Sequence, residues 1–505
     1  MRLPAYSQIS CMFLACLFSV VGHLNADEKG DAAKTDDPKP ASFYRQVRPI
    51  LQRHCVGCHQ PAKRGGKLML TTFEGFNQGG ENGNSFTPGK PDESLVLDYI
   101  SGEKPEMPRD AKPLAKEQVA LIARWIKEGA KDDTPEAAKD TITAANPPKY
   151  VRPPVVTALA YSPDGKLLAV SGFHETLLHK ADGSGIVGRL VGTAHRIESV
   201  AFSPDGKLLA VVGGNPSLFG EVQLWARSQA GAWERAKLVG SKTLTFDVCY
   251  GVSFSPDGKL LAFGAADNKA RVVTVPEFKP IMRFDAHTGY VLGTTFSLKG
   301  DHLISVSRDQ SMKLIIVKNA QLVDNITSIT PGALKGPLMS VQRHPLKEQV
   351  LVAGENGQPK LFKIFRTRKR IIGDDFNLIR NYDKLPGRIY SLQFNKDGSR
   401  FVVGSSTAKD GTARIYTTGV YDEKTTNNAG GLGQTFQAIA ARSKEKALLH
   451  ELQGTGPVFA VAYRPDGQQV AVGGFDGKIR LFDANTGKLV KAFVPVKITA
   501  ATAAR

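Results

Sequence analysis

Long hydrophobic runs are nearly absent from this chain of 505 residues. The one continuous apolar stretch, Cys11 to Gly22, is too short for a membrane-spanning helix, which needs about 20 apolar residues. Composition is otherwise that of a soluble globular protein, and the length exceeds what one ordinary core accommodates. We therefore expect two or three domains (about 150 residues each) and no transmembrane anchor in the mature chain.

The short apolar stretch has the flanks of an export signal. Arg2 precedes it, Leu24-Asn25-Ala26 follows it, and a charged segment without aromatic residues comes next. This order is typical of a secretory signal peptide cut near Ala26, whereas a buried helix is the alternative. The sequence therefore predicts a signal peptide over residues 1–26, a flexible tether over 27–41 and a periplasmic or cell-envelope location.

Cysteine is scarce, with five in the whole chain. Export would remove Cys11 and Cys16 and leave Cys55, Cys58 and Cys249. Three cysteines exclude a disulfide framework. Cys249 lies within an alternating apolar run, so we expect it to be a buried strand residue.

Acidic residues are in deficit in only one part of the chain. Residues 27–136 hold 17 basic and 18 acidic residues, whereas residues 137–505 hold 48 basic and 30 acidic ones. An exported chain meets little nucleic acid, so we expect no nucleic-acid partner despite the basic balance. An anionic protein or glycan is the expected partner of the basic part.

What the basic part does have is repetition. After a Pro/Ala/Thr linker over 131–154, the motif Ser-Pro-Asp-Gly-Lys-Leu-Leu-Ala recurs between short alternating strands, and weaker copies bring the number of units to seven. In each turn, Pro sets φ, Asp caps locally and Gly takes a positive φ. Units of about 40 to 50 residues with four strands predict an all-β propeller of seven blades over residues 155–497. Residues 421–446 form an insertion that we expect to be a Gly-rich surface loop with a short helix projecting from the propeller.

These hairpins resemble those of the WD-repeat family. The family's polar signature is weaker here: one third strand ends in Leu224-Trp225 and another in Phe482-Asp483. His195 and His287 stand where the family has a Gly-His pair, which implies structural histidines that bond within a blade.

The sequence "HCVGCH" at residues 54–59 is the strongest chemical signal. A structural zinc site needs four ligands, and no second Cys or His pair lies nearby; the flanks also differ from those of a redox dithiol. Cys-X-X-Cys-His is the attachment signature of c-type haem, which takes two thioether bonds and an axial histidine. The motif therefore predicts one covalent haem c held by Cys55 and Cys58, with His59 as an iron ligand.

Two helical patterns flank this motif over residues 42–130. Ser42 is a candidate N-cap for a helix whose apolar face carries Phe43, Val47, Ile50 and Leu51. A second helix carries an apolar face and ends at a glycine; these residues are Leu114, Val119, Ile122, Trp125, Ile126 and Gly129. Two such helices indicate a small all-α cytochrome c unit.

A second axial ligand should lie between the motif and the last helix. Met107, on a Pro-rich loop just before that helix, is the preferred candidate. Met69 lies among apolar residues and is expected to be a packing residue, and His54 would need a tighter path. A vacant or differently ligated iron is the remaining alternative.

Residues 43–130 resemble the planctomycete-type cytochrome c domain, through "FYRQVRPILQRHCVGCH", "RGGKLMLTT", "GGENG", "PGKPDESLVLDYI", "EMPRDAKPL" and "RWIKEGA" in that order. The resemblance implies Cys55 and Cys58 as haem anchors, His59 as proximal ligand and Met107 as distal ligand. Ala115 departs from the family, which tends to place a capping Ser or Thr there.

Together these features predict an exported electron-transfer cytochrome, whose propeller is a docking platform for a redox partner protein or an anionic surface. With both axial positions filled, one-electron exchange is the chemistry that remains. The alternative is an oxidoreductase with a second cofactor in the propeller channel, but the propeller histidines fall at unmatched positions. A basic run at 362–371 (Lys363, Arg366, Arg368, Lys369 and Arg370) is either a charged edge strand or an anion-binding patch.

Overall fold

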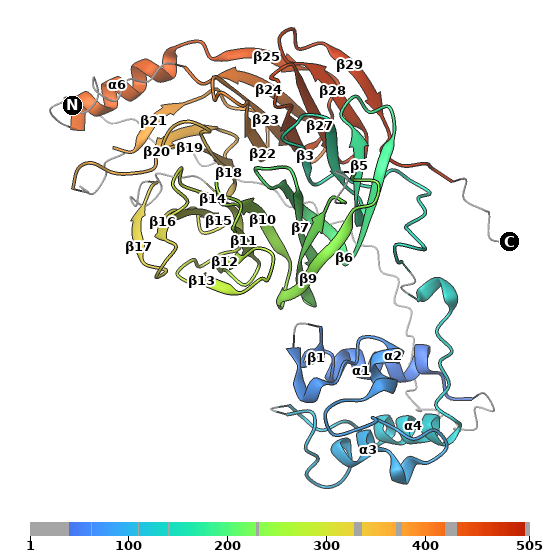
Figure 1. The fold of residues 1–505 in the computed structure, drawn as a ribbon. Helices are drawn as coiled ribbons and strands as arrows, with labels where there is room; N and C mark the ends of the chain where they lie inside the picture. Colours follow the sequence, from blue (N-terminus) through green and yellow to red (C-terminus); the bar gives the residue numbers. More distant parts are fainter. Residues whose placement is uncertain are drawn as a thin grey trace, which may run out of the picture.

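The structure is a computed structural model that describes residues 40–61, 63–109, 111–139, 142–228, 232–327, 336–369, 376–419 and 432–499. A helical part comes first in the chain and a larger strand-rich part follows it (Figure 1). The expected signal peptide and residues 27–39 of the expected tether lie outside the described residues.

The helical part consists of short helices and one small hairpin. Its elements are η1 (Phe43–Val47), α1 (Arg48–His54), β1 (His59–Gln60), β2 (Lys63–Arg64), η2 (Gly65–Lys67), α2 (Phe73–Gln78), η3 (Pro91–Glu93), α3 (Leu95–Ile100), α4 (Lys116–Lys127) and η4 (Glu136–Ala138).

The first predicted helix is confirmed, although it divides into the π-helix η1 and the α-helix α1. The Ser42 hydroxyl accepts a hydrogen bond from the Arg45 backbone N–H at 2.9 Å, which is the expected N-cap. All four predicted apolar positions are buried.

The second predicted helix is α4, which buries Ile122 and Ile126. Gly129, with φ of +98°, follows its end as expected. Ala115 has no side-chain acceptor for the helix N-terminus, and the Gln118 side chain compensates in part by accepting the Ala115 backbone N–H at 3.1 Å.

Aromatic rings fill the core between these helices. The Trp125 ring centroid lies 5.5 Å from Phe43, 5.9 Å from Phe76 and 5.0 Å from Phe86. Pairs at these separations add to the stabilisation that burial supplies. The helical part therefore has a core of its own, built from residues of η1, α2, α4 and the loop after α2.

The strand-rich part contains five sheets of four strands and one of seven, all antiparallel. The seven-stranded sheet holds β3 (Leu159–Tyr161), β4 (Leu167–Ser171), β5 (Phe173–Lys180), β6 (Ile186–Phe202), β7 (Leu208–Asn215), β8 (Phe219–Ala226) and β9 (Lys237–Thr245). The next two sheets hold β10 (Cys249–Phe254), β11 (Leu260–Ala265), β12 (Ala270–Thr274) and β13 (Pro280–Phe284), then β14 (Val291–Phe296), β15 (His302–Ser307), β16 (Met312–Ile316) and β17 (Leu322–Asn325). The last three hold β18 (Leu338–Arg343), β19 (Gln349–Gly354), β20 (Lys360–Lys363) and β21 (Leu378–Asn381), then β22 (Arg388–Phe394), β23 (Arg400–Ser406), β24 (Gly411–Thr417) and β25 (Leu448–Leu452), then β26 (Val458–Tyr463), β27 (Gln469–Gly474), β28 (Ile479–Asp483) and β29 (Leu489–Phe493).

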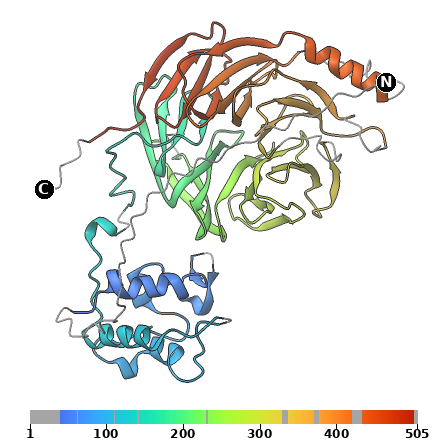
Figure 2. The ribbon, with the colours of Figure 1, turned by 180° about the vertical axis from the view of Figure 1, so that it is seen from behind.

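The sheets stand side by side around a centre (Figures 1 and 2). The long strand β6 joins two groups of four, because its first half pairs with β5 and its second half pairs with β7. The first strands of successive groups, β3, β6, β10, β14, β18, β22 and β26, are neighbours in that order, and β26 lies beside β3.

The repeated turn has the predicted chemistry. In Ser203-Pro204-Asp205-Gly206, the Ser203 hydroxyl donates to the Asp205 carboxylate at 2.7 Å and accepts the Leu208 N–H at 2.9 Å, while Gly206 has φ of +67°. The turns that begin at Ser162 and Ser255 repeat these bonds. Each turn therefore sets the register of a first strand against its second strand.

The two histidines of the weak family signature differ. His287 lies between Ser305 and Asp309, with Nε2 and Nδ1 each 2.8 Å from a side-chain oxygen, so its structural role is confirmed. His195 instead lies against His174, with ring centroids 4.1 Å apart. The sequence pattern did not predict this neighbouring pair.

The linker before β3 is tied to the strand-rich part through Tyr150. The Tyr150 hydroxyl donates to the buried Glu175 carboxylate at 2.9 Å, and Glu175 also pairs with Arg189. The Tyr150 backbone forms a parallel bridge with Ile498 near the other end of the strand-rich part. Segments far apart in sequence thus meet where β3 adjoins the last sheet.

The predicted insertion contains the helix α6 (Leu432–Lys444), while residues 420–431 lie outside the described part. Ile439 is buried against the sheet formed by β18–β21, and the Arg442 Nε–H donates to the Ile379 carbonyl at 2.8 Å. The end of α6 is thus packed on β21 rather than projecting freely.

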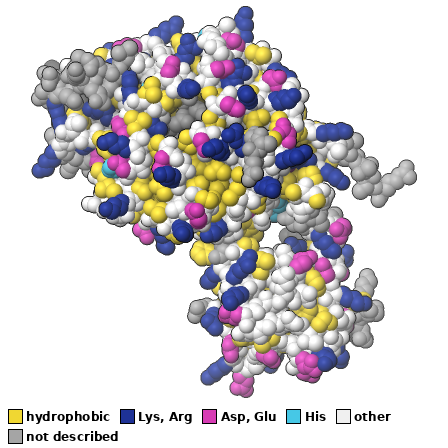
Figure 3. Space-filling model, in the orientation of Figure 1, with side chains coloured by type: hydrophobic (Ala, Val, Ile, Leu, Met, Phe, Trp, Pro, Cys, Tyr) yellow, Lys and Arg dark blue, Asp and Glu magenta, His cyan; other side chains and the backbone are white. Residues whose placement is uncertain are grey.

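Lysine and arginine side chains are spread over the visible face of the strand-rich part, and the helical part carries both signs of charge (Figure 3). Within the described residues, no helix is long and apolar enough to cross a membrane.

Candidate functional site

The motif Cys55 to His59 forms a tight turn at the end of α1. The Cys55 carbonyl accepts the backbone N–H groups of both Cys58, at 3.0 Å, and His59, at 3.1 Å. The helix thus ends where the two cysteines and the histidine begin, and one turn of chain presents all three.

Both thiols of this turn are free. Cys55 is half-buried, and burial, together with the neighbouring Cys58, raises its pKa to about 11. Cys58 is exposed, and the Lys63 ammonium donates to its sulfur at 3.3 Å. The motif is therefore not a disulfide hairpin in this structure, and both sulfurs are available for thioether bonds.

The backbone of His59 is hydrogen-bonded, whereas one nitrogen of its ring has no hydrogen-bond partner among the described residues. Its carbonyl accepts the Leu70 N–H at 2.8 Å, but ring Nδ1 is buried without a hydrogen-bond partner among the described residues. Burial lowers the pKa of His59, which favours the neutral imidazole. Neutral imidazole is the form that binds metal ions.

The two methionine candidates differ in position. Met107 is half-buried and packs against the hydrophobic core of the helical part, as Cys55 also does. Its backbone N–H donates to the Tyr99 carbonyl at 2.9 Å. Met69 does not pack on this core within the described part of the chain, although it lies close to Gly75 at the start of α2. The third candidate, His54, is the last residue of α1.

These residues fit a c-type haem. The candidate ligands are two thiols outside any disulfide, an imidazole with a ring nitrogen that has no hydrogen-bond partner among the described residues, and a half-buried thioether. The thioether, like Cys55, packs against the core of the helical part. Among the described residues, no three His, Cys, Asp or Glu side chains form a candidate ion site. A haem iron does not need such a group, since one histidine and one methionine complete its axial positions.

Cys249 lies in β10 and is fully buried, as predicted. Burial raises its pKa to about 12, and its sulfur lies 3.4 Å from the Thr245 hydroxyl. It therefore remains a protonated packing residue at neutral pH.

The edge-strand interpretation of the basic run is wrong. β20 lies between β19 and β21, and Lys363 is buried with its ammonium 4.0 Å from the Phe376 ring centroid. Arg366 and Arg368 lie 5.3 Å from the same ring, whereas Arg370 is outside the described residues. The charged residues of this run suggested an exposed edge, and nothing in the sequence indicated that β20 pairs with β19 on one side and β21 on the other.

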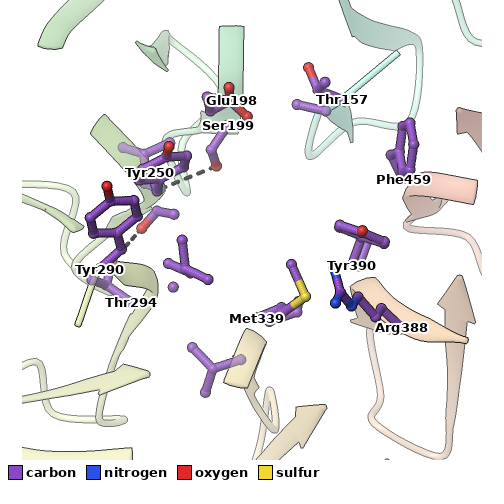
Figure 4. A pocket seen from close by; sticks show the side chains of 18 of the residues that line it. Thr157, Glu198, Ser199, Tyr250, Tyr290, Thr294, Met339, Arg388, Tyr390 and Phe459 are labelled. Atoms are coloured by element: carbon purple, nitrogen blue, oxygen red, sulfur yellow. Dashed lines mark hydrogen bonds between the residues drawn. The ribbon is translucent and has the colours of Figure 1, made fainter. Parts of the chain in front are cut away.

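A cavity of about 720 Å³ lies where the first strands of the sheets converge. Aromatic side chains in or directly before separate first strands line it, among them Tyr250, Tyr290, Tyr390 and Phe459 (Figure 4). The sequence patterns did not indicate these residues. The available signal was an aromatic residue at or near the start of several first strands.

Family models match both parts of the chain. A model described as "Planctomycete cytochrome C" matches residues 55–110, a range that contains Cys55, Cys58, His59 and Met107. A model described as "WD domain, G-beta repeat" matches residues 187–218, 238–273, 278–315, 379–417 and 446–483.

Curated relatives resemble parts of the chain. "Periodic tryptophan protein 2" of Arabidopsis thaliana is 26% identical over 239 residues, which are 47% of this chain and 22% of that protein. "U3 small nucleolar RNA-associated protein 4 homolog" of Homo sapiens is 29% identical over 160 residues, or 32% of this chain and 19% of that protein. "Eukaryotic translation initiation factor 3 subunit I" of Drosophila grimshawi is 24% identical over 287 residues, or 48% of this chain and 84% of that protein. The match thus spans only a small part of the first two.

Proposed function

We propose that this chain, which joins a cytochrome-like region to a WD-repeat domain, is an exported one-electron carrier with a single covalent haem c. The observation that carries the proposal is the turn Cys55 to His59: two free thiols and a half-buried imidazole with an unused nitrogen, within the region that matches planctomycete cytochromes.

The residues have distinct roles in this proposal. Cys55 and Cys58 would hold the haem through thioether bonds, and His59 and Met107 would be the ligands of its iron. A bound haem supplies reversible one-electron oxidation and reduction of its iron. Ligation of the iron by a methionine would raise its reduction potential relative to ligation by two histidines.

The strand-rich part serves as the docking platform. We infer that it is a closed ring of seven four-stranded blades, because the first strands are neighbours around the centre and β26 lies beside β3. The bridge between Tyr150 and Ile498 supports closure at the same place. A rigid ring with an excess of basic residues suits a redox partner protein or another anionic partner.

Export to the periplasm or cell envelope belongs to the same proposal. It rests on the sequence of residues 1–26, which has the order of a signal peptide. Mass measurement of the secreted protein should give a chain that begins near Asp27, and a chain that retains Arg2 would contradict export by cleavage.

The decisive experiment is an optical spectrum of the full chain, produced with export and haem-maturation machinery. We expect one c-type haem per chain by pyridine haemochrome, and a low-spin ferric spectrum with the weak far-red band of methionine-ligated haem. Met107→Leu should abolish that band and lower the reduction potential, because a thioether ligand is lost while the size of the side chain is nearly kept.

Met69→Leu is the matched control, since it makes the same chemical change at a residue that does not pack on the core. It should leave the band and the potential unchanged. If the band were lost in Met69→Leu and kept in Met107→Leu, the distal ligand would be Met69 and not Met107. A chain without covalent haem would contradict the proposed function. A second chromophore would instead indicate an oxidoreductase.

A further inference from the structure

The cavity at the centre of the strand-rich part opens at one particular end of the ring. Its lining comes mostly from the starts of first strands, such as Tyr250 in β10 and Arg388 in β22, and from the point in β6 where pairing with β7 begins, near Glu198. Arg308 and Glu355, which follow the second strands β15 and β19, complete it. In an antiparallel hairpin, the start of the first strand and the end of the second lie at the same end. The cavity is therefore the mouth of a central channel.

The mouth has apolar surface on facing walls. Tyr390 and Phe459 form an edge-to-face pair with ring centroids 5.0 Å apart, and Met339 lies beside this pair (Figure 4). Tyr250 and Tyr290 stand on the opposite wall (Figure 4). The volume of about 720 Å³ is large enough to hold a bulky side chain.

The charges of the mouth are not balanced. Arg196 is paired with Glu198 at 2.9 Å, and Arg388 with Glu355 at 2.7 Å. Arg308 stacks over the Tyr290 ring at 5.0 Å and has no ion pair within the part of the chain that the structure describes. The lining thus holds three arginines against two glutamates, so the rim attracts negative charge.

The helical part touches the ring at this same end. Leu218 lies in the turn between β7 and β8, which follows a second strand, and it packs against the hydrophobic core of the helical part. A molecule bound at the mouth would therefore sit at the end of the ring that adjoins the cytochrome-like region.

We propose that the channel mouth binds an acidic peptide segment of a partner protein, with one aromatic side chain of that segment inserted between the tyrosine and phenylalanine walls. The arginine rim pairs with the acidic flanks of the segment, and the apolar walls bury its anchor. This inference rests on the proposed docking role and specifies the chemistry of the partner.

The test is isothermal titration calorimetry of the haem-loaded full chain with three synthetic peptides. Glu-Glu-Phe-Glu-Glu should bind saturably with one site per chain. Glu-Glu-Ser-Glu-Glu should bind about tenfold more weakly, because it lacks the anchor. Lys-Lys-Phe-Lys-Lys should not bind, because the rim repels it.

Arg308→Glu is the key variant, since this exposed arginine can be changed without breaking an ion pair that the structure describes. It should weaken binding of the acidic phenylalanine peptide about fivefold or more at low ionic strength, with a smaller effect at high salt. Lys488→Glu is the matched control, because it makes the same charge change at an exposed position just before β29, away from the channel mouth.

Three outcomes would each overturn the inference: no binding of the acidic phenylalanine peptide, equal binding of the serine peptide, or equal losses in Arg308→Glu and Lys488→Glu. Equal binding of the two acidic peptides would indicate a general polyanion surface instead. The haem spectrum of each preparation separates the two proposals, since the docking site can fail with the haem intact, and the haem can be absent while the peptide binds.

Discussion

At the scale of single residues, Tyr150 joins the linker to the strand-rich part through its hydroxyl group. Its hydroxyl donates to Glu175 and accepts the Phe173 N–H at 3.0 Å. The Glu175 side chain is fully buried, and Arg189 supplies its countercharge. A buried carboxylate tolerates its position only while such partners are present.

Tyr150→Phe should therefore destabilise the strand-rich part by about 1–2 kcal/mol, because two hydrogen bonds are lost in a buried site while Arg189 continues to neutralise Glu175. The measurement is the denaturant midpoint of its unfolding by circular dichroism. Tyr44→Phe is the control, since the Tyr44 hydroxyl has no hydrogen bond among the described residues. Equal midpoints for the two variants would mean that the Tyr150 hydroxyl does not contribute.

At the scale of elements, the repeated turn decides where each first strand meets its second strand. The Ser255 hydroxyl accepts the Leu260 backbone N–H and the Asp257 carboxylate accepts the Lys259 backbone N–H, and a glycine with positive φ reverses the chain. The hydrogen bonds that Asp257 accepts from the Ser255 hydroxyl and the Lys259 backbone N–H hold the pKa of its carboxyl below the ordinary range.

Gly258→Ala should cost about 1 kcal/mol of stability, because Gly258 has φ of +72° and a β-carbon is strained in that region. The comparison is Gly185→Ala, where φ is not positive and an added β-carbon meets no heavy atom within 4 Å. That variant should be close to neutral. Thermal unfolding of both proteins checks the pair, and a Gly185→Ala loss as large as that of Gly258→Ala would count against turn strain as the cause.

At the scale of the whole molecule, several phenol and thiol groups are buried in neutral form. The Tyr161 hydroxyl donates to Gln469 at 2.9 Å and the Tyr382 hydroxyl donates to the Thr418 carbonyl at 2.8 Å. Burial raises the pKa of both tyrosines above the ordinary value of 10.0, and it raises the pKa of Tyr416 to about 12. The pKa of Cys249 follows the same pattern, from 9.0 to about 12.

These shifts predict loss of stability at alkaline pH. Between the ordinary and the raised pKa, the unfolded chain releases protons that the folded chain retains, so the free energy of unfolding falls as pH rises. For the tyrosines the window begins near pH 10, and for Cys249 near pH 9. The thermal midpoint should therefore decline steadily above pH 9, together with the appearance of tyrosinate absorbance. Tyr161→Phe should reduce the slope, and a midpoint that stays constant up to pH 12 would contradict the burial of these groups.

Local sequence patterns determined the elements of this protein and the chemistry of its strongest motif. The turn residues, the apolar faces of α1 and α4, and the burial of Cys249 follow from side-chain type and spacing between near neighbours. Such features could be predicted because a turn or an amphipathic helix depends on residues only a few positions apart. The spacing of Cys55, Cys58 and His59 likewise indicated haem attachment by itself.

Tertiary structure decided what depends on residues far apart in the chain. Tyr150 meets Ile498, His174 meets His195, and β20 lies between two other strands, although no local pattern indicates these neighbours. The central cavity is the clearest case, since side chains from β6 to β26 converge there only when the separate sheets stand side by side. Long-range packing brings together residues that are far apart in the sequence and that show no regular spacing. For that reason the candidate docking site could be found only in the folded molecule.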